Sequence, residues 1–167
     1  PMTRDIVCHH PELVPLLRDP LDAGRVERIS VLLEAWGTLE IPRLPTGLIS
    51  AVHGAGANAV SGYDAVWLRD TVHVAHVLWR TGDVDAAREI LTALLGFQAK
   101  TITRFDDVIE GRADPDDPQQ RPHVRFDGQR LGEFDIPWAH AQNDALGYVI
   151  WLAGSLLREG DWRPDAD

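Results

Sequence analysis

The sequence predicts a mainly α-helical protein whose helices form an inner and an outer layer. Residues 145–157 carry apolar side chains on nearly every side of the expected helix, which is typical of a helix buried all round. Residues 84–105 carry theirs in one broad stripe with polar residues opposite, which is typical of a helix that covers a core from outside. We therefore expect residues 145–157 in the inner layer and residues 84–105 in the outer layer.

Further helices are expected ahead of these two. Residues 11–18, 23–36 and 67–80 place apolar side chains at helical spacing, which indicates three helices. Asp83 follows a Thr-Gly pair and is expected to cap the helix that begins after it. Because this link is short, residues 67–80 and 84–105 should pack as an antiparallel hairpin.

The remaining segments predict loops and a little β structure. Residues 38–65 are rich in proline and glycine, which indicates a long ordered loop or a few short strands, and so long a loop is often functional. Residues 106–120 are acidic and contain prolines. Their spacing does not match that of a helix-loop-helix calcium site, so we expect a solvated loop. Residues 123–134 alternate around Asp127-Gly128 and predict a small β-hairpin.

Size and composition limit the classes of protein that fit. A chain of 167 residues and 18.5 kDa suits a single domain, here residues 1–167. Its net charge of −10 would repel nucleic acid and anionic membranes, so neither is expected as a partner. Cys8 is the only cysteine, which excludes an intramolecular disulfide and a cysteine-based metal cluster. The N-terminal residues lead to no long apolar run, so we expect a cytoplasmic location.

The first candidate site lies at the start of the helix expected at residues 67–80. Arg69 offers a fork of hydrogen-bond donors, and the neighbouring Asp70 accepts hydrogen bonds. Together they can bind vicinal hydroxyl groups, and Trp67 can stack on the apolar face of a sugar ring. The alternative is an Arg–Asp pair that only caps the helix at the surface.

The second candidate site precedes the inner helix. Trp138, His140, Gln142 and Asp144 each suit a sugar contact, and the helix dipole favours the negative charge of Asp144 in a first turn. The alternative is a buried polar cap that only satisfies the end of the helix.

A third candidate is the pair His73 and His76, which lie three residues apart and therefore on one side of a helix. A metal site needs a third ligand, and the zinc signature with glutamate between two histidines is absent. We therefore interpret them as histidines beside the core and expect neither a metal nor another cofactor.

Three short motifs together resemble glycoside hydrolase family 15, which includes glucoamylases, glucodextranases and the regulatory subunits of phosphorylase kinase. Trp-x-Arg-Asp stands at residues 67–70 and Trp-x-x-x-Gln-x-Asp at residues 138–144. Residues 122–127 are similar to a third family segment. The resemblance extends over about residues 50–157 and implies an incomplete (α/α)6 barrel of the six-hairpin toroid type, with its pocket at the N-terminal ends of the inner helices.

The resemblance also implies a function. Arg69 and Asp70 would hold the terminal glucosyl unit of an α-glucoside or oligosaccharide, and Trp138 would line the pocket. His140, Gln142 and Asp144 would surround it. The implied activity is that of a cytoplasmic hydrolase of carbohydrate metabolism that cleaves α-glucosidic bonds with inversion.

The catalytic carboxylates of this implied reaction are not assigned. Inversion needs a carboxylic acid and a carboxylate about 6.5–9.5 Å apart, and the family carries both as glutamates on later segments than this chain contains. Glu133 and Asp135 are near the expected pocket, but neither takes the role, so the chain alone is expected to be inactive. The alternatives are a non-catalytic carbohydrate-binding or regulatory module of the phosphorylase kinase type, a half-barrel that associates with itself, or one that needs its missing C-terminal part.

Overall fold

The computed structural model describes residues 9–17, 21–51 and 65–164. The chain divides into two compact units, residues 1–41 and residues 42–167. The single domain expected over residues 1–167 stays a prediction. Residues 52–64 of the expected long loop lie outside the described residues.

The first unit contains a short 3-10 helix, η1 (Pro11–Leu13), and one α-helix, α1 (Ala23–Ala35). The side chain of Asp22 caps α1 by accepting a hydrogen bond from the backbone N–H of Arg25 at 2.8 Å. The α-helix expected at residues 11–18 is wrong. Pro15 follows directly on this turn, and a proline removes a backbone donor that a continuing helix would need.

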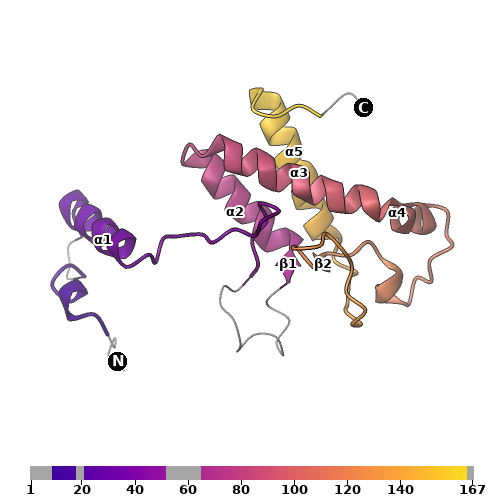
Figure 1. Cartoon of the computed structure of the whole chain (residues 1–167), viewed down its shortest axis with the longest axis horizontal. Helices are drawn as coiled ribbons and strands as arrows, with labels where there is room; N and C mark the ends of the chain where they lie inside the picture. The colour runs from indigo at the N-terminus through magenta and orange to yellow at the C-terminus, as the bar shows by residue number, and fades with distance from the viewer. Residues whose placement is uncertain (1–8, 18–20, 52–64, 165–167) are drawn as a thin grey trace, which may run out of the picture. The chain divides into compact units, whose positions relative to one another are not determined.

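Three helices form the body of the second unit. They are α2 (Leu68–Arg80), α3 (Val84–Lys100) and α5 (Asn143–Glu159). The expected hairpin of α2 and α3 is confirmed, and the Asp83 carboxylate caps α3 by accepting from the backbone N–H of Ala86 at 3.1 Å. α2 also packs against α5, and α3 crosses α5 (Figure 1).

The outer helix ends earlier than the sequence predicted. α3 stops before Thr101, and a separate helix, α4 (Ile102–Ile109), follows. The Thr101 hydroxyl donates to the carbonyl oxygens of Phe97 and Gln98 at 3.1 and 3.4 Å. A threonine that bonds to the preceding turn in this way competes with the helix ladder. The loop expected from residue 106 therefore begins only after Ile109, and it includes a second 3-10 helix, η2 (Pro118–Gln120).

The β structure is a two-stranded antiparallel sheet rather than the expected local hairpin. β1 (Val66–Trp67) pairs with β2 (Arg125–Phe126), with Val66 opposite Phe126 and Trp67 opposite Arg125. Within residues 123–134 only the single bridge between Asp127 and Gly132 remains. β2 is fully buried, and pairing with β1 joins it to the main core, which a solvent-exposed hairpin would not do.

Gly128 follows β2 at a point of close packing. A Cβ atom added there would lie 2.2 Å from Val66 Cγ2 and 2.7 Å from Leu44 Cδ1. The Thr46 hydroxyl also donates to the carbonyl oxygen of Gly128 at 2.6 Å. Only the absence of a side chain lets this turn lie against β1.

The expectation that α5 is buried on every side is wrong. Its core face is buried, but Ile150 and Leu157 are 74% and 49% exposed, and Trp151 is 43% exposed. Among the described residues, α2 and α3 are the helices that cover α5, and they leave its other flank in solvent.

The core of the second unit is therefore formed between α2, α3, α5 and the sheet. Phe97 of α3 stacks on Phe126 of β2 with the ring centroids 3.7 Å apart. The mainly helical fold class is confirmed, with a small antiparallel sheet in place of a hairpin. In the described part of the chain, no helix is long and apolar enough to cross a membrane. The buried apolar side chains around this stack include Leu48, Leu68, Val72, Ile90, Leu91, Leu94, Val149, Leu152 and Leu156.

We predict that Leu152→Ala lowers the free energy of unfolding by about 2–5 kcal/mol, because it leaves a cavity in a fully buried site. Ile109→Ala is the matched control. Its side chain is 80% exposed, so a change within about 0.5 kcal/mol is expected. Urea unfolding followed by circular dichroism measures both, and equal effects would contradict the core described here.

Candidate functional site

The starts of α2 and α5 meet in the second unit. Arg69 lies in the first turn of α2, and Asp144 lies in the first turn of α5. Arg69 Nη2 is 2.6 Å from Asp144 Oδ2, and the same nitrogen donates to Gln142 Oε1 at 3.2 Å. The structure thus brings together three side chains that the sequence analysis placed in two separate candidate sites.

The sheet holds the start of α2 in this place. Trp67 is the last residue of β1 and the N-cap of α2, with an extended backbone. The next residue, Leu68, donates its backbone N–H to the carbonyl oxygen of Val124 at 3.0 Å. This bond gives one of the first N–H groups of α2 a partner outside the helix. Arg69 and Asp70 then emerge from the first turn with exposed side chains.

Asp70 does not pair with its neighbour Arg69. Arg69 binds Asp144 across the helix starts instead, so the Arg–Asp surface cap weighed as an alternative is not formed. Among the described residues, no hydrogen bond or ion pair engages the exposed carboxylate of Asp70. An acidic group in the first turn is favoured by the helix dipole, and its oxygens remain available to a ligand.

An aromatic cluster adjoins these polar groups. The rings of Trp67 and Trp138 meet edge to face with centroids 5.1 Å apart. The guanidinium carbon of Arg125 lies 5.0 Å from the Trp138 ring, 5.9 Å from the Trp67 ring and 4.8 Å from the Phe134 ring. Arg125 is only 5% exposed, whereas Trp138 keeps 37% of its surface exposed. The three rings thus cover a buried cation, and Trp138 presents an indole to solvent.

The sequence analysis did not identify Arg125 and Phe134 as part of this cluster. Both were assigned to the expected hairpin. The sequence does contain one indication that Arg125 is buried, because it stands between the apolar residues Val124 and Phe126 in a short strand. A buried arginine needs a partner such as an aromatic ring.

Gln142 connects the aromatic cluster to the ion pair. Its Nε2 donates to the carbonyl oxygen of Ala139 at 3.0 Å, and its Oε1 accepts from Arg69. Gln142 is also the N-cap of α5, although its side chain does not bond to the backbone of that helix. The two bonds fix the segment between Trp138 and Asp144 against the start of α2.

His140 is placed below this surface and not on it. It is 3% exposed, and its ring stacks on His123 with centroids 3.7 Å apart and planes 10° apart. The backbone N–H of Val124 lies 3.3 Å from His140 Nδ1, so this nitrogen accepts and carries no proton. His140 therefore fits the alternative of a buried polar group, while Trp138, Gln142 and Asp144 have solvent contact.

Burial keeps both histidines neutral. Burial is the largest cause that lowers the pKa of His140, to about 4, and the neighbouring His123 and Arg104 act in the same direction. Burial also lowers the pKa of His123. Two stacked rings with little access to water favour the uncharged form, because each charge would be poorly solvated and would repel the other.

Glu133 lies next to this histidine pair. Arg104 binds both of its carboxylate oxygens, one of them through Nη2 at 2.7 Å. The hydrogen bond from Arg104 is the largest cause that lowers the pKa of Glu133. His123 Nδ1 lies 3.8 Å from Glu133 Oε1. Glu133 therefore stays ionised as a structural partner of Arg104, while Asp135 lies on the exposed surface.

His73 and His76, the pair considered as possible metal ligands, lie in α2. The ring of His73 is 4.8 Å from that of Tyr148, and the ring of His76 is 4.8 Å from that of Trp151. In residues 9–17, 21–51 and 65–164, no three histidine, cysteine, aspartate or glutamate side chains gather as ligands for a metal ion.

The chain is similar to the uncharacterized lipoprotein YgeQ of Escherichia coli strain K12. The two are 28% identical over 180 residues, which cover 95% of this chain and 68% of that protein. No family model matches the chain, and no solved structure matches it.

These findings contradict the resemblance to glycoside hydrolase family 15. The expected glucoamylase-like hydrolysis with inversion is wrong, and so are the role in carbohydrate metabolism and the alternative module of the phosphorylase kinase type. The motifs at residues 67–70 and 138–144 are short sets of aromatic and polar residues. Such sets recur at helix starts because caps and cation–π contacts need them, whatever the family.

The cytoplasmic location expected from the N-terminal residues is also contradicted, since the similar protein is named a lipoprotein. The expectation rested on the absence of a long apolar run in those residues, which is indirect evidence of location.

We predict that the second unit loses stability in mild acid. The folded-state pKa of His140 is about 4 and its ordinary value is 6.5, so between these values the unfolded chain binds a proton that the folded chain does not. The contribution of the neutral ring is complete above about pH 6.5 and is lost as pH falls towards 4, by up to about 1.4 kcal/mol per pH unit.

Urea unfolding at pH 7, 6 and 5 measures this slope. His73→Gln is the matched control, because it replaces an exposed histidine and should leave the slope unchanged. His140→Gln should reduce it, and the slope that remains comes from His123, whose pKa is also lowered by burial. A free energy of unfolding that stays constant from pH 7 to pH 5 would contradict the neutral histidine pair.

Proposed function

We propose that the second unit binds a saccharide, or another ligand with vicinal hydroxyl groups, at the surface formed by Trp67, Arg69, Asp70, Trp138, Gln142 and Asp144. The observation that carries the proposal is the Arg69–Asp144 ion pair at 2.6 Å, joined by Gln142 to the segment of the exposed Trp138. The proposal concerns binding and rests on these side chains alone, without reference to any family.

The polar groups have the chemistry that vicinal hydroxyls require. A hydroxyl both donates and accepts hydrogen bonds, so a site for two neighbouring hydroxyls needs donors and acceptors side by side. Arg69 supplies donors, and Asp70 and Asp144 supply acceptors on two adjoining helix starts. The side chains of Arg69 and Asp144 are 45% and 53% exposed, so a ligand can reach them without displacing other protein groups.

The aromatic groups supply the second element of sugar recognition. The apolar face of a sugar ring packs on an indole, and Trp138 is 37% exposed. Its ring is held by the edge of Trp67 and by the guanidinium of Arg125. A ring fixed before binding loses little conformational freedom when a ligand arrives, which favours affinity. His140 supports this surface from below through its bond to Val124.

We predict that Trp138→Ala and Arg69→Ala each remove saccharide binding, because one loses the stacking surface and the other loses the donors. Arg130→Ala is the matched control, since Arg130 is an exposed arginine in an ion pair with Asp127. Saturation-transfer NMR with maltose and cellobiose measures binding by each variant.

Two outcomes would contradict saccharide binding at this surface. If neither sugar gives a transfer signal with the unmodified chain, or if Arg130→Ala weakens the signal as much as Arg69→Ala, the proposal is wrong. Circular dichroism of each variant shows whether the fold is kept.

We also propose that residues 42–167 form an incomplete (α/α)6 barrel that associates with a second copy of the chain. α2 and α5 would be inner helices and α3 an outer one. The support comes from α5, where Ile150 and Leu157 lie seven residues apart, and therefore on one face, and are 74% and 49% exposed. Apolar side chains exposed along one face of a helix indicate an interface.

Binding to nucleic acid or to an anionic membrane is still not expected, given the charge of −10.

We predict that Ile150→Glu shifts the chain towards the monomer, because it places a charge in this interface. Gln129→Glu adds the same charge at an exposed loop position and should have no effect. Sedimentation velocity at several concentrations measures the association. A chain that is monomeric at all of them, with or without Ile150→Glu, would contradict self-association.

A further inference from the structure

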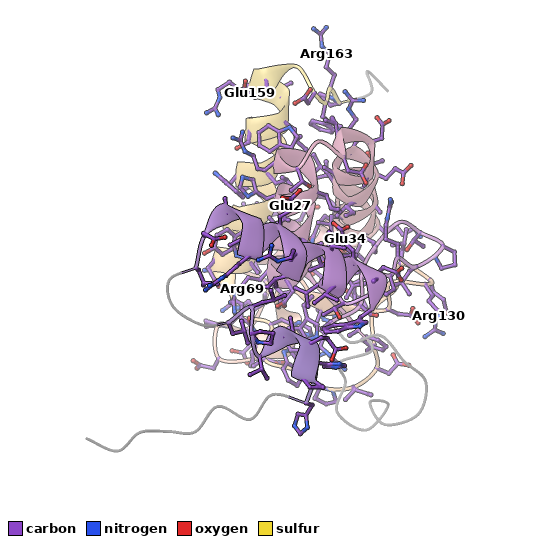
Figure 2. All side chains as sticks on the ribbon, turned by 90° about the vertical axis from the view of Figure 1, so that its left-hand side faces the viewer. Glu27, Glu34, Arg69, Arg130, Glu159 and Arg163 are labelled. Carbon is purple, nitrogen blue, oxygen red and sulfur yellow. The ribbon has the colours of Figure 1, made fainter. Side chains whose placement is uncertain are left out.

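A cavity lies at the opposite ends of α2 and α5 from the saccharide surface. Its volume is about 420 Å³, within the range of sites for small organic molecules. α2 ends at Arg80 and α5 ends at Glu159, and both residues line it. Figure 2 shows Glu159 far from Arg69, towards the end of the second unit where α5 terminates. The full lining is His76, Trp79, Arg80, Trp151, Gly154, Ser155, Arg158 and Glu159.

The walls of this cavity are aromatic. The ring of His76 lies 5.8 Å from Trp79 and 4.8 Å from Trp151. Trp79 Nε1 donates to Asp161 Oδ2 at 2.7 Å, which fixes its indole in place. Trp151 is 43% exposed and so leaves much of a large apolar ring uncovered. A planar ligand could stack on these rings without any rearrangement of the core.

A serine hydroxyl lines the same cavity. Ser155 is only 8% exposed as a residue, but its hydroxyl is not among the buried polar atoms of the described residues that lack a hydrogen-bond partner. A serine inside a helix commonly bonds back to the preceding turn. Because Ser155 lines the cavity, its hydroxyl can donate a hydrogen bond to a ligand oxygen there.

The rim carries positive charge in a chain of net charge −10. The guanidinium carbon of Arg80 lies 5.7 Å from the Trp79 ring centroid, and no carboxylate in the described part of the chain pairs with it. Within the described residues, Arg158 pairs with its neighbour Glu159 at 3.2 Å. The C-termini of α2 and α5 each carry about half a negative charge, which offsets much of the charge of Arg80, but the N–H donors of its guanidinium still have no carboxylate partner among the described residues. The cavity therefore offers a guanidinium, without a carboxylate partner in the described part of the chain, beside two indoles.

We infer that this cavity binds a small planar organic anion, an aromatic carboxylate in chemical class. The ring would stack on Trp151 and Trp79, and the carboxylate would accept hydrogen bonds from Arg80 and Ser155. Charge-assisted hydrogen bonds to a guanidinium are stronger than those between neutral groups. The inference is independent of the saccharide proposal, because no residue is shared between the two sites.

The test uses 2-naphthoate and its neutral counterpart 2-naphthamide with the whole chain. NMR resonances of the indole N–H groups, assigned through single Trp→Phe variants, report on each tryptophan separately. We expect 2-naphthoate to shift the resonances of Trp79 and Trp151 and to bind about tenfold more tightly than the amide, since one charge-assisted bond is lost in the amide. Equal affinity for both compounds, no shift, or shifts confined to Trp67 and Trp138 would overturn the inference.

Substitutions separate a specific site from general electrostatic attraction. Arg80→Ala and Ser155→Ala should each weaken 2-naphthoate binding. Arg163→Ala is the matched control, because it removes an exposed positive charge at the same end of the second unit (Figure 2) and lines a different cavity. If Arg163→Ala weakens binding as much as Arg80→Ala, the inference fails. Circular dichroism confirms that each variant is folded, and Arg80 is exposed, so its loss leaves the core intact.

Discussion

The antiparallel pairing of β1 with β2 is the constraint on which the second unit depends. It contains only two residues on each strand, yet it joins the start of α2 to the segment that leads into α5. Trp67 stands opposite Arg125 in this pair, so the ladder that aligns the backbones also brings the cation to its aromatic neighbours. On the inner side, Phe126 stacks on Phe97 and anchors the sheet to α3. Backbone pairing, cation–π contact and aromatic packing thus all involve residues of these two short strands.

Four polar side chains, two of them buried and two partly buried, contact one another beside the sheet. They are His123, His140, Glu133 and Arg104, and each satisfies part of the requirements of another. The ion pair between Arg104 and Glu133 keeps one charge of each sign together. The two histidines are uncharged. A partly satisfied polar network is costly in a protein interior, and His123 Nδ1 does lack a hydrogen-bond partner among the described residues. This network ties the segment before α5 to the end of the acidic loop.

The sequence predicted the helices best where long periodic stretches decide the structure. α1, α2 and α5 begin and end within a few residues of the expected positions, because apolar spacing and caps are local signals. The errors arose where a distant partner or one hydrogen bond decides. Thr101 divides the expected outer helix, and β2 pairs with β1 instead of with its neighbour in the chain. Burial of α5 was overestimated, since periodicity shows which residues are apolar and not how many neighbours cover them.

The candidate site shows the same limit. Two helix starts with complementary charges were recognised, but the sequence did not show that Arg69 would bind Asp144 in preference to the adjacent Asp70. His140 was expected beside a ligand and is instead buried, because its ring packs on His123, a contact no local pattern indicates. Arg125 was missed altogether, since its contacts are with Trp67 of β1 and with Phe134 and Trp138 of the segment before α5.

The contact between Gly128 and Val66 has an evolutionary consequence. Even a methyl group at position 128 would meet Val66 Cγ2 at 2.2 Å, and Val66 is fully buried in the sheet. A side chain at position 128 therefore fits only alongside a loss of volume at Val66 or Leu44. The three positions cannot drift independently, and a lineage that enlarges one of them must rebuild the turn that carries Arg125 into the aromatic cluster.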